Sequence, residues 1–456
     1  MPDGDNSHTE CLFPLQAKPP TIRSDFPAVS NTQLAIHFLL QLAVILLACR
    51  VVGKVAAKLG QPQVVAEMIT GVLLGPSLFG LCWPSAHAWL FPAESQRVLY
   101  PFAQAGLALY MFIVGLEFRG DIVRQRLRSM AAVSAAGMLA PFALGAALGW
   151  VFIQHTSLFT SQTGAVEGML FLGAALCISA FPMMARVIDH RHLNSTTVGA
   201  VSLSAGAIND AAAWCLLAIV LARREGDWNR ALLTIGGGLL IVPLVLKFLR
   251  PLLHRCQGWF VRNDALTPGG MLVLIALMAA GAWFTGLIGL HLVLGAFLVG
   301  AAVPRGVIVR DLVSRLKPLT VALLLPLFFT YSGMHTKMGL LNSAWLWQMC
   351  LAVLAAAIVG KGVACWLAAR ATGLSNREAL GIGTLMNVRG LMELIIINIG
   401  LEKGIISPGL FAILVVMAIV TTVMACPVFD RLVGAGESNQ SSVVSNQIIE
   451  STRHSH

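Results

Sequence analysis

An acidic residue lies inside an apolar stretch that is long enough to cross a membrane. Asn209 and Asp210 stand side by side in the sequence SLSAGAINDAAAWCLLAIVLA, residues 202–222. A carboxylate at membrane depth is costly unless it is paired, hydrated or in use. Such a group can hold a proton or a metal ion but not both, and this competition is sufficient for antiport. The alternative is an ion pair that only holds two helices together.

Two cations, Lys361 and Arg389, also fall inside apolar stretches. They are the candidates for compensating the charge of Asp210. Glu393 follows Arg389 by four residues, a helical spacing that favours a structural ion pair as much as contact with a transported ion. Glu117 ends another apolar stretch. Its position suits either cation entry at the cytosolic edge or a solvated helix end.

The composition indicates a membrane protein. Of the 456 residues, 57% are hydrophobic and only 11% are charged, with a mean hydropathy of +0.78, whereas a soluble domain has about 25% charged residues. The net charge of +10 comes from basic residues in short loops, so we expect no nucleic-acid partner. The nine cysteines form no CxxC pair and no GxxxxGK[ST] motif is present. We therefore expect no metal site of its own, no cofactor and no ATP-hydrolysing activity.

Apolar segments of roughly 17–25 residues are candidate membrane-spanning helices. Thirteen such segments cover residues 33–53, 63–80, 98–117, 131–154, 167–187, 196–222, 231–250, 269–287, 289–304, 318–334, 344–369, 379–400 and 408–430. We expect an all-α polytopic protein of the lipid bilayer, with about 13 transmembrane helices in a domain over residues 33–430. A polar extracytoplasmic tail over residues 1–32 and a disordered cytoplasmic tail over residues 431–456 flank it.

The distribution of basic residues predicts the orientation. An odd number of spans places the two ends of the chain on opposite sides of the membrane. With the N-terminus outside, the inner loops hold 21 Lys and Arg residues and the outer segments hold 8. The positive-inside rule then predicts an N-terminus outside and a cytoplasmic C-terminus. We expect the protein in the cell (inner) membrane.

The fifth and twelfth expected helices are interrupted. Pro182 lies in the middle of the fifth, which removes a backbone donor and either kinks or breaks the helix. The centre of the twelfth, MNVRG over residues 386–390, is polar, charged and glycine-bearing. Helices one to six and eight to thirteen form two six-helix halves of opposite topology, in which the interrupted helices correspond. Such pairs are typical of inverted-repeat transporters with a site near the membrane midplane, and we expect the two broken helices to cross there.

Several stretches together carry a family likeness: GVLLGPSLFG (71–80), GLEF (115–118), ISAFPMMARVI (178–188), SAGAINDAAAW (204–214), LMNVRGLMELIIINIG (385–400) and FAILVVMAIVTT (411–422). GLEF alone is a weak signal, but the set in this order and at these spacings is specific. Across about residues 33–430 the chain resembles the monovalent cation:proton antiporter superfamily, and within it the cation/H⁺ exchanger branch.

The resemblance implies a thirteen-helix homodimer in which a core domain moves against a dimerisation domain by alternating access. Asp210 would carry the cation and the proton in turn, and Na⁺ or K⁺ would be the only metal there. Asn209 would be its helix-capping or ligand neighbour, with Ser179 near it on the broken helix. Lys361 and Arg389 would compensate charge.

Two departures from relatives also carry expectations. Some relatives have a second acid where this chain has Asn209, and a single titrating carboxylate favours one-for-one electroneutral exchange. The alternative is that a releasable pair of Lys361 and Asp210 also moves charge. Many relatives carry a soluble nucleotide-binding domain after the last helix. Here a Ser/Asn/Gln-rich tail over residues 434–456 follows, so no such regulatory domain is expected in this chain.

We therefore predict a secondary active antiporter, rather than an enzyme, that exchanges Na⁺ or K⁺ for H⁺. The alternative is a sodium-coupled symporter of an organic solute, because the bile-acid symporter family shares crossed broken helices. An organic solute needs a wide cavity, and the set of Asp210, Lys361 and Arg389 fits ion chemistry better. The sequence does not choose between Na⁺ and K⁺.

Overall fold

The structure of the chain is a computed structural model that describes residues 31–433 except 59, 119–121, 123–124 and 335–342. The predicted tails over residues 1–32 and 431–456 therefore lie almost entirely outside the described residues. Within the described part, 11 helices are long and apolar enough to cross a membrane. The chain is a mostly helical, polytopic membrane protein.

The helices follow one another along the chain with short connections. Up to residue 225 they are α1 (Asn31–Lys58), α2 (Gln63–Leu74), α3 (Phe79–Cys82), α4 (Pro84–Leu90), α5 (Ala93–Glu117), α7 (Leu127–His155), α8 (Ala165–Cys177), α9 (Phe181–His190) and α10 (Thr197–Glu225). After it they are α11 (Trp228–Leu244), α12 (Arg250–Arg255), α13 (Gln257–Phe260), α14 (Pro268–Leu287), α15 (Leu292–Ala302), α16 (Val307–Leu319), α17 (Leu325–Met334), α18 (Ala344–Ile358), α19 (Ala364–Ala371), α20 (Asn376–Met386), α21 (Leu391–Glu402) and α22 (Pro408–Val433). Three π-helical turns, η1 (Val245–Leu249), η2 (Thr320–Leu324) and η3 (Val359–Val363), continue α11, α16 and α18 without a break.

Two predicted spans correspond to helices that are too short to be counted among the 11. The segment predicted over residues 289–304 is α15, with 11 residues. The segment predicted over 379–400 is the pair α20 and α21, with 11 and 12 residues. The total of thirteen spans therefore stays a prediction.

One predicted boundary is wrong by three turns. The helix expected over residues 318–334 begins at Val307. Its first part carries Arg310, Asp311, Arg315 and Lys317 on an otherwise apolar helix. A criterion of continuous apolarity passes over such an amphipathic segment, because half of its surface is charged.

The expectation of an all-α protein is corrected by a small β-hairpin. Strands β1 (Val261–Arg262) and β2 (Ala265–Leu266) pair antiparallel in the connection between α13 and α14. Asn263 and Asp264 form the turn with φ of +52° each. Asn and Asp tolerate this left-handed region, which two-residue hairpin turns require.

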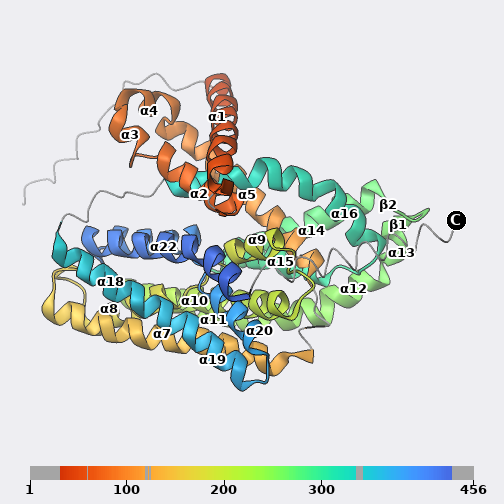
Figure 1. Cartoon of the computed structure of the whole chain (residues 1–456). Coiled ribbons are helices and arrows are strands. Elements are labelled where there is room, and N and C mark those ends of the chain that lie inside the picture. The colour runs from red at the N-terminus through yellow and green to blue at the C-terminus, as the bar shows by residue number, and fades with distance from the viewer. Residues whose placement is uncertain (1–30, 59, 119–121, 123–124, 335–342, 434–456) are drawn as a thin grey trace, which may run out of the picture.

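The helices pack as two groups (Figure 1). Helix α11 packs on α10 of one group, and η1, which continues it, packs on α15 of the other. The first helix group consists of α1, α2, α5 and α14 to α17, in which α5 packs along α15 and α17 packs on α2. The second helix group consists of α7 to α10 and α18 to α22, in which α7 packs along α8, α10 and α19. Helix α9 belongs to the second group through α10, and it also contacts α2 and α5 of the first.

Glycines allow the closest helix contacts. A Cβ atom on Gly115 of α5 would lie 2.9 Å from the backbone nitrogen of Ala301, and one on Gly300 would lie 3.0 Å from that of Leu116. Small residues let two helix backbones approach in this way, which is how helices associate where no water drives them together.

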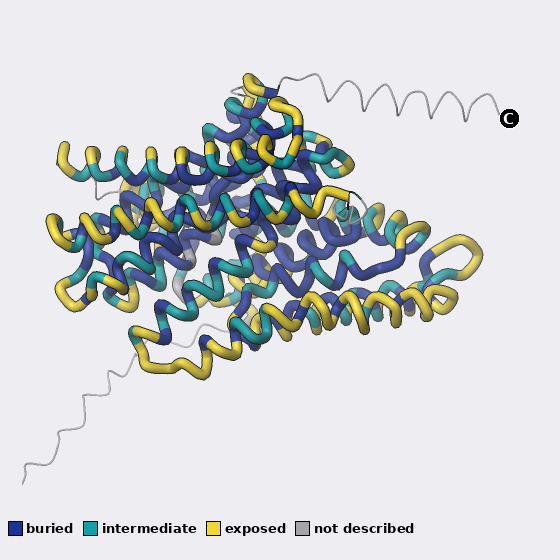
Figure 2. The backbone as a smooth tube through the Cα atoms, turned by 90° about the horizontal axis from the view of Figure 1, so that it is seen from below, coloured by how far each residue is buried: buried dark blue, intermediate teal, exposed yellow. Residues whose placement is uncertain are grey.

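The burial pattern fits a lipid environment. Dark blue, buried backbone fills the centre of the molecule in Figure 2, and yellow, exposed turns lie on its outside. The exposed side chains include large apolar ones on α1, α11 and α14, such as Leu39, Leu239 and Leu272. Backbone polar groups are satisfied inside each helix, so these apolar outer faces are suited to hydrocarbon.

Candidate functional site

Asp210 lies near the middle of α10, whose ends are fixed by local signals. The side chain of Thr196 accepts a hydrogen bond from the Gly199 backbone nitrogen at 3.1 Å at the start, and Gly226 ends the helix at φ +80°, a conformation that favours glycine. Asp210 is only 1% exposed. Its Oδ2 atom is buried and has no hydrogen-bond partner among the described residues. Because an unpaired buried oxygen is costly, this atom is the natural place for a proton or a ligand.

Asn209, which precedes Asp210 in α10, forms a hydrogen bond with a residue of α7. The Asn209 amide and the Ser134 hydroxyl lie 2.7 Å apart, and in the orientation that satisfies both groups the amide nitrogen donates to Ser134 and to the Ala205 carbonyl. Gly137 makes room for this contact, because a Cβ there would lie 3.2 Å from the Asn209 amide. Asn209 is completely buried. It is therefore fixed by a hydrogen bond between two helices of the second group.

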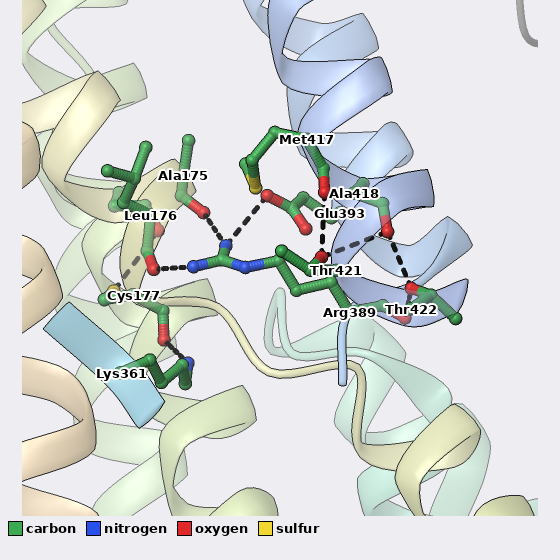
Figure 3. A network of polar contacts seen from close by, with 11 residues as sticks. Ala175, Leu176, Cys177, Lys361, Arg389, Glu393, Met417, Ala418, Thr421 and Thr422 are labelled. Carbon is green, nitrogen blue, oxygen red and sulfur yellow. Dashed lines mark hydrogen bonds and ion pairs between the residues drawn. The ribbon is translucent and has the colours of Figure 1, made fainter. Parts of the chain in front are cut away.

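The first interruption leaves the carbonyl groups at the end of α8 without partners in their own helix. Two cations satisfy them (Figure 3). Arg389 donates to the carbonyls of Ala175 at 3.0 Å and Leu176 at 2.5 Å, and Lys361 donates to the carbonyl of Cys177. The C-terminal end of a helix carries partial negative charge, which these cations complement.

Arg389 also pairs with Glu393. The guanidinium and the carboxylate lie 3.0 Å apart, and both side chains are completely buried. The backbone carbonyl of Arg389 accepts from the Thr422 hydroxyl at 2.5 Å, which ties the interruption to α22. Arg389 and Glu393, together with Asp210 and Lys361, are two bases and two acids whose formal charges cancel.

The two interruptions are in direct contact. The backbone nitrogen of Ala180, between α8 and α9, donates to the carbonyl of Val388, between α20 and α21, at 3.4 Å. Gly390 permits this approach, since a Cβ there would lie 2.9 Å from the Cβ of Ala180. Helix α10 packs against α8, α9 and α20. The polar backbone of both interruptions therefore gathers beside the helix of Asp210.

The structure gives the other predicted residues different surroundings. Ser179 lies in the first interruption, completely buried, and its hydroxyl has no hydrogen-bond partner in the part of the chain that the structure describes. Within the described residues Asp210 forms no ion pair with Lys361 or Arg389. Glu117 lies elsewhere, in an ion pair with Lys317 at 2.9 Å.

Sequence reasoning missed two polar residues beside these. Ser134 could have been noticed as a hydroxyl in the apolar segment 131–154, but its partner Asn209 is 75 residues away. Asn387 lies in the second interruption, is 4% exposed and has a buried Oδ1 without a partner. It was visible as part of the polar centre MNVRG, in which only Arg389 was given a role.

Residues 42–433 match the family model of the sodium/hydrogen exchanger, transmembrane. The chain belongs to this family. It is 36% identical to the Na⁺/H⁺ antiporter NhaS4 of Synechocystis over 409 residues, which cover 88% of this chain and 98% of that protein.

Two eukaryotic relatives are longer than this chain. It is 31% identical to cation/H⁺ antiporter 17 of Arabidopsis thaliana over 98% of its own length and 54% of that protein. It is also 31% identical to K⁺/H⁺ antiporter 1 of Saccharomyces cerevisiae, over 86% of its length and 46% of that protein. The chain thus spans about half the length of these two relatives.

The fold has a counterpart among solved structures. The sodium proton antiporter MjNhaP1 from Methanocaldococcus jannaschii superposes with a TM-score of 0.55 over 88% of this chain and 98% of that one. At 13% identity, this likeness concerns the fold alone.

Proposed function

We propose that this protein is a secondary active antiporter that exchanges a monovalent cation, Na⁺ or K⁺, for H⁺ by alternating access. The observation that carries the proposal is the buried, unpartnered Oδ2 of Asp210 in a membrane-spanning helix. A proton or a cation can occupy this oxygen, and each excludes the other. Membership of the exchanger family and the names of the relatives, which are antiporters of Na⁺, K⁺ or cations, support the same exchange.

In this proposal Asn209 and Ser179 supply neutral oxygen ligands beside Asp210. Hard monovalent cations prefer oxygen, and the Ser179 hydroxyl is buried with no other partner. Lys361 and Arg389 balance the charge of Asp210 and Glu393 without a direct ion pair to Asp210. Because one carboxylate binds both substrates, we infer one-for-one electroneutral exchange.

The proposed architecture has thirteen spans in two inverted halves, with the interrupted helices α8–α9 and α20–α21 crossing at the midplane. The contact between Ala180 and Val388 supports the crossing. We infer an N-terminus outside, a cytoplasmic C-terminus and a place in the cell membrane from the loop charges. We also infer a homodimer, supported by the family resemblance and by α1 and α11, which belong to the least buried of the 11 spans.

The test is cation-driven proton movement in vesicles that carry the purified protein and a pH-sensitive dye. Na⁺, K⁺ and Li⁺ are added separately. Asp210→Asn keeps the side-chain volume, so we expect folded protein without exchange, whereas Asp210→Glu should retain partial exchange with altered apparent cation affinity. Asp264→Asn, at the exposed hairpin turn, is the matched control and should exchange at the wild-type rate.

Substantial Na⁺- or K⁺-driven proton movement by Asp210→Asn, at matched protein levels, would contradict the assignment of the site. Uptake of a labelled organic solute with Na⁺, without proton release, would favour the symporter instead. No observation in the structure favours that alternative, so we do not propose it.

A further inference from the structure

A second cluster of charges lies at the end of α5, far along the chain from Asp210. The ammonium group of Lys317 lies 2.9 and 3.1 Å from the two carboxylate oxygens of Glu117. The same ammonium lies 2.7 Å from Oδ1 of Asp189. Arg186 adds a longer ion pair to Asp189, at 3.8 Å. Two acids and two bases thus balance one another in one cluster.

This cluster connects the two helix groups. Glu117 on α5 and Lys317 on α16 belong to the first group, and Asp189 on α9 belongs to the second. The bond from Lys317 to Asp189 therefore spans the boundary, while the bond to Glu117 lies inside one group. If the groups move against each other, the bond to Asp189 is the one that must break.

The cluster closes one end of the interface along α10. Beside Glu117 a cavity of only about 10 Å³ lies against Asn194 and Leu203, which is space for about one water molecule. Toward the other end of α10, a cavity of about 230 Å³ reaches Trp214 and Leu217. Leu203 and Leu217 lie seven residues before and after Asp210. Of these two cavities beside α10, the one on the Lys317 side of Asp210 is much the smaller.

We propose that Lys317 closes the cytoplasmic side of the transport path by holding Asp189 of the second helix group to Glu117 of the first. The proposal rests on the proposed function and on the inferred orientation, in which α5, α9 and α16 all meet at the cytoplasmic surface. Release of Asp189 separates the groups there and opens a path along Leu203 to Asp210. The freed carboxylates of Asp189 and Glu117 then face an entering cation.

The energetics suit a contact that forms and breaks in each cycle. The three side chains are 16–26% exposed, so water screens their attraction. Ion pairs in such surroundings contribute little stability. The cluster can therefore favour the arrangement in which the two helix groups are in contact there, and it can still break in each transport cycle.

The test measures access to Leu203→Cys from the cytoplasmic face of inside-out vesicles with a membrane-impermeant thiol reagent. The labelling of the same chain without this cysteine is subtracted as background. Lys317→Met should raise the labelling rate about fivefold, which corresponds to the loss of about 1 kcal/mol of bias. Arg315→Met is the matched control, because it removes the same charge from α16 at a residue that pairs only with Asp311 among the described residues. It should leave labelling unchanged.

Two further variants keep the test decisive. Lys317→Arg, which keeps a cation between Glu117 and Asp189, should leave labelling near the parent rate. Leu217→Cys, on the other side of Asp210, should not become more reactive from the cytoplasmic face in Lys317→Met. Labelling of Leu203→Cys that is equal with and without Lys317→Met, or that rises as much in Lys317→Arg as in Lys317→Met, overturns the proposal. Cation-driven proton movement by the wild-type protein, measured in the same vesicles, tests the proposed function separately.

Discussion

Arg389 and Glu393 face each other one helical turn apart at the start of α21, 3.0 Å apart and both completely buried. The same guanidinium holds the last carbonyls of α8. Arg389, in the second interruption, thus joins Glu393 in the first turn of α21 to the free end of a helix more than 200 residues earlier in the chain. Because both interruptions take part in this contact, we expect substitutions of Arg389 to affect both stability and transport.

Arg389→Met should destabilise the protein by about 3–5 kcal/mol, the usual cost of leaving a buried charge without its partner. The carbonyls of Ala175 and Leu176 lose their donor as well. The double variant Arg389→Met with Glu393→Leu should recover part of this loss, because no unpaired charge remains. Unfolding of the purified protein in detergent, followed with temperature, measures both. A double variant that is less stable than the single one would refute the ion pair as the main contribution.

Lys361→Met should lower stability by about 1–3 kcal/mol, since a hydrogen bond from a charged group to the Cys177 carbonyl is lost. Exchange in the wild type and in the surviving variant should not respond to an imposed membrane potential. The measurement is cation-driven proton movement in vesicles with and without a K⁺ diffusion potential. A wild-type rate that follows the potential, and loses this response in Lys361→Met, would make Lys361 a charge carrier instead.

Ser134→Ala should weaken apparent cation affinity while leaving the maximal rate nearly unchanged. The Asn209 amide loses the hydroxyl 2.7 Å away, so it no longer holds a fixed position beside Asp210. A double-mutant cycle with Asn209→Ala should give a coupling of about 1 kcal/mol in unfolding free energy, typical of one hydrogen bond. Effects of the two substitutions that simply add would show that the pair is not coupled.

Gly390→Ala should slow transport and destabilise the protein by about 1–3 kcal/mol, the usual cost of overpacking. The new methyl group would lie 2.9 Å from the Cβ of Ala180 and 3.3 Å from that of Met183, so the two interruptions must separate. Gly236→Ala in α11 is the matched control, because no atom lies within 4 Å of its new Cβ. Its stability should be unchanged or slightly higher. Equal effects of both substitutions on transport would exclude close contact of the interruptions as the cause.

Much of this molecule was predictable from local sequence. In lipid, each helix must satisfy its own backbone hydrogen bonds and present apolar side chains to the hydrocarbon. Long apolar stretches of the sequence therefore indicate the membrane spans. A charge in such a stretch stands out for the same reason, which is how Asp210, Lys361 and Arg389 were found. The four-residue spacing of Arg389 and Glu393 allowed either an ion pair or contact with a transported ion, and the structure has the ion pair.

The partners of these residues were decided by the tertiary structure. Lys361 donates to a carbonyl 184 residues away, and Ser134 meets Asn209 only because α7 packs along α10. The sequence marked Lys361 and Arg389 as candidates for compensating the charge of Asp210, and the tertiary structure shows that both donate to carbonyl groups at the interrupted end of α8. Lys317 lies in an amphipathic segment, where a basic residue does not stand out from the sequence. Only the packing of α9 between the two helix groups brings Asp189 close to Lys317. Local sequence determines which groups cannot face lipid alone, and the three-dimensional packing of distant segments decides which group satisfies each of them.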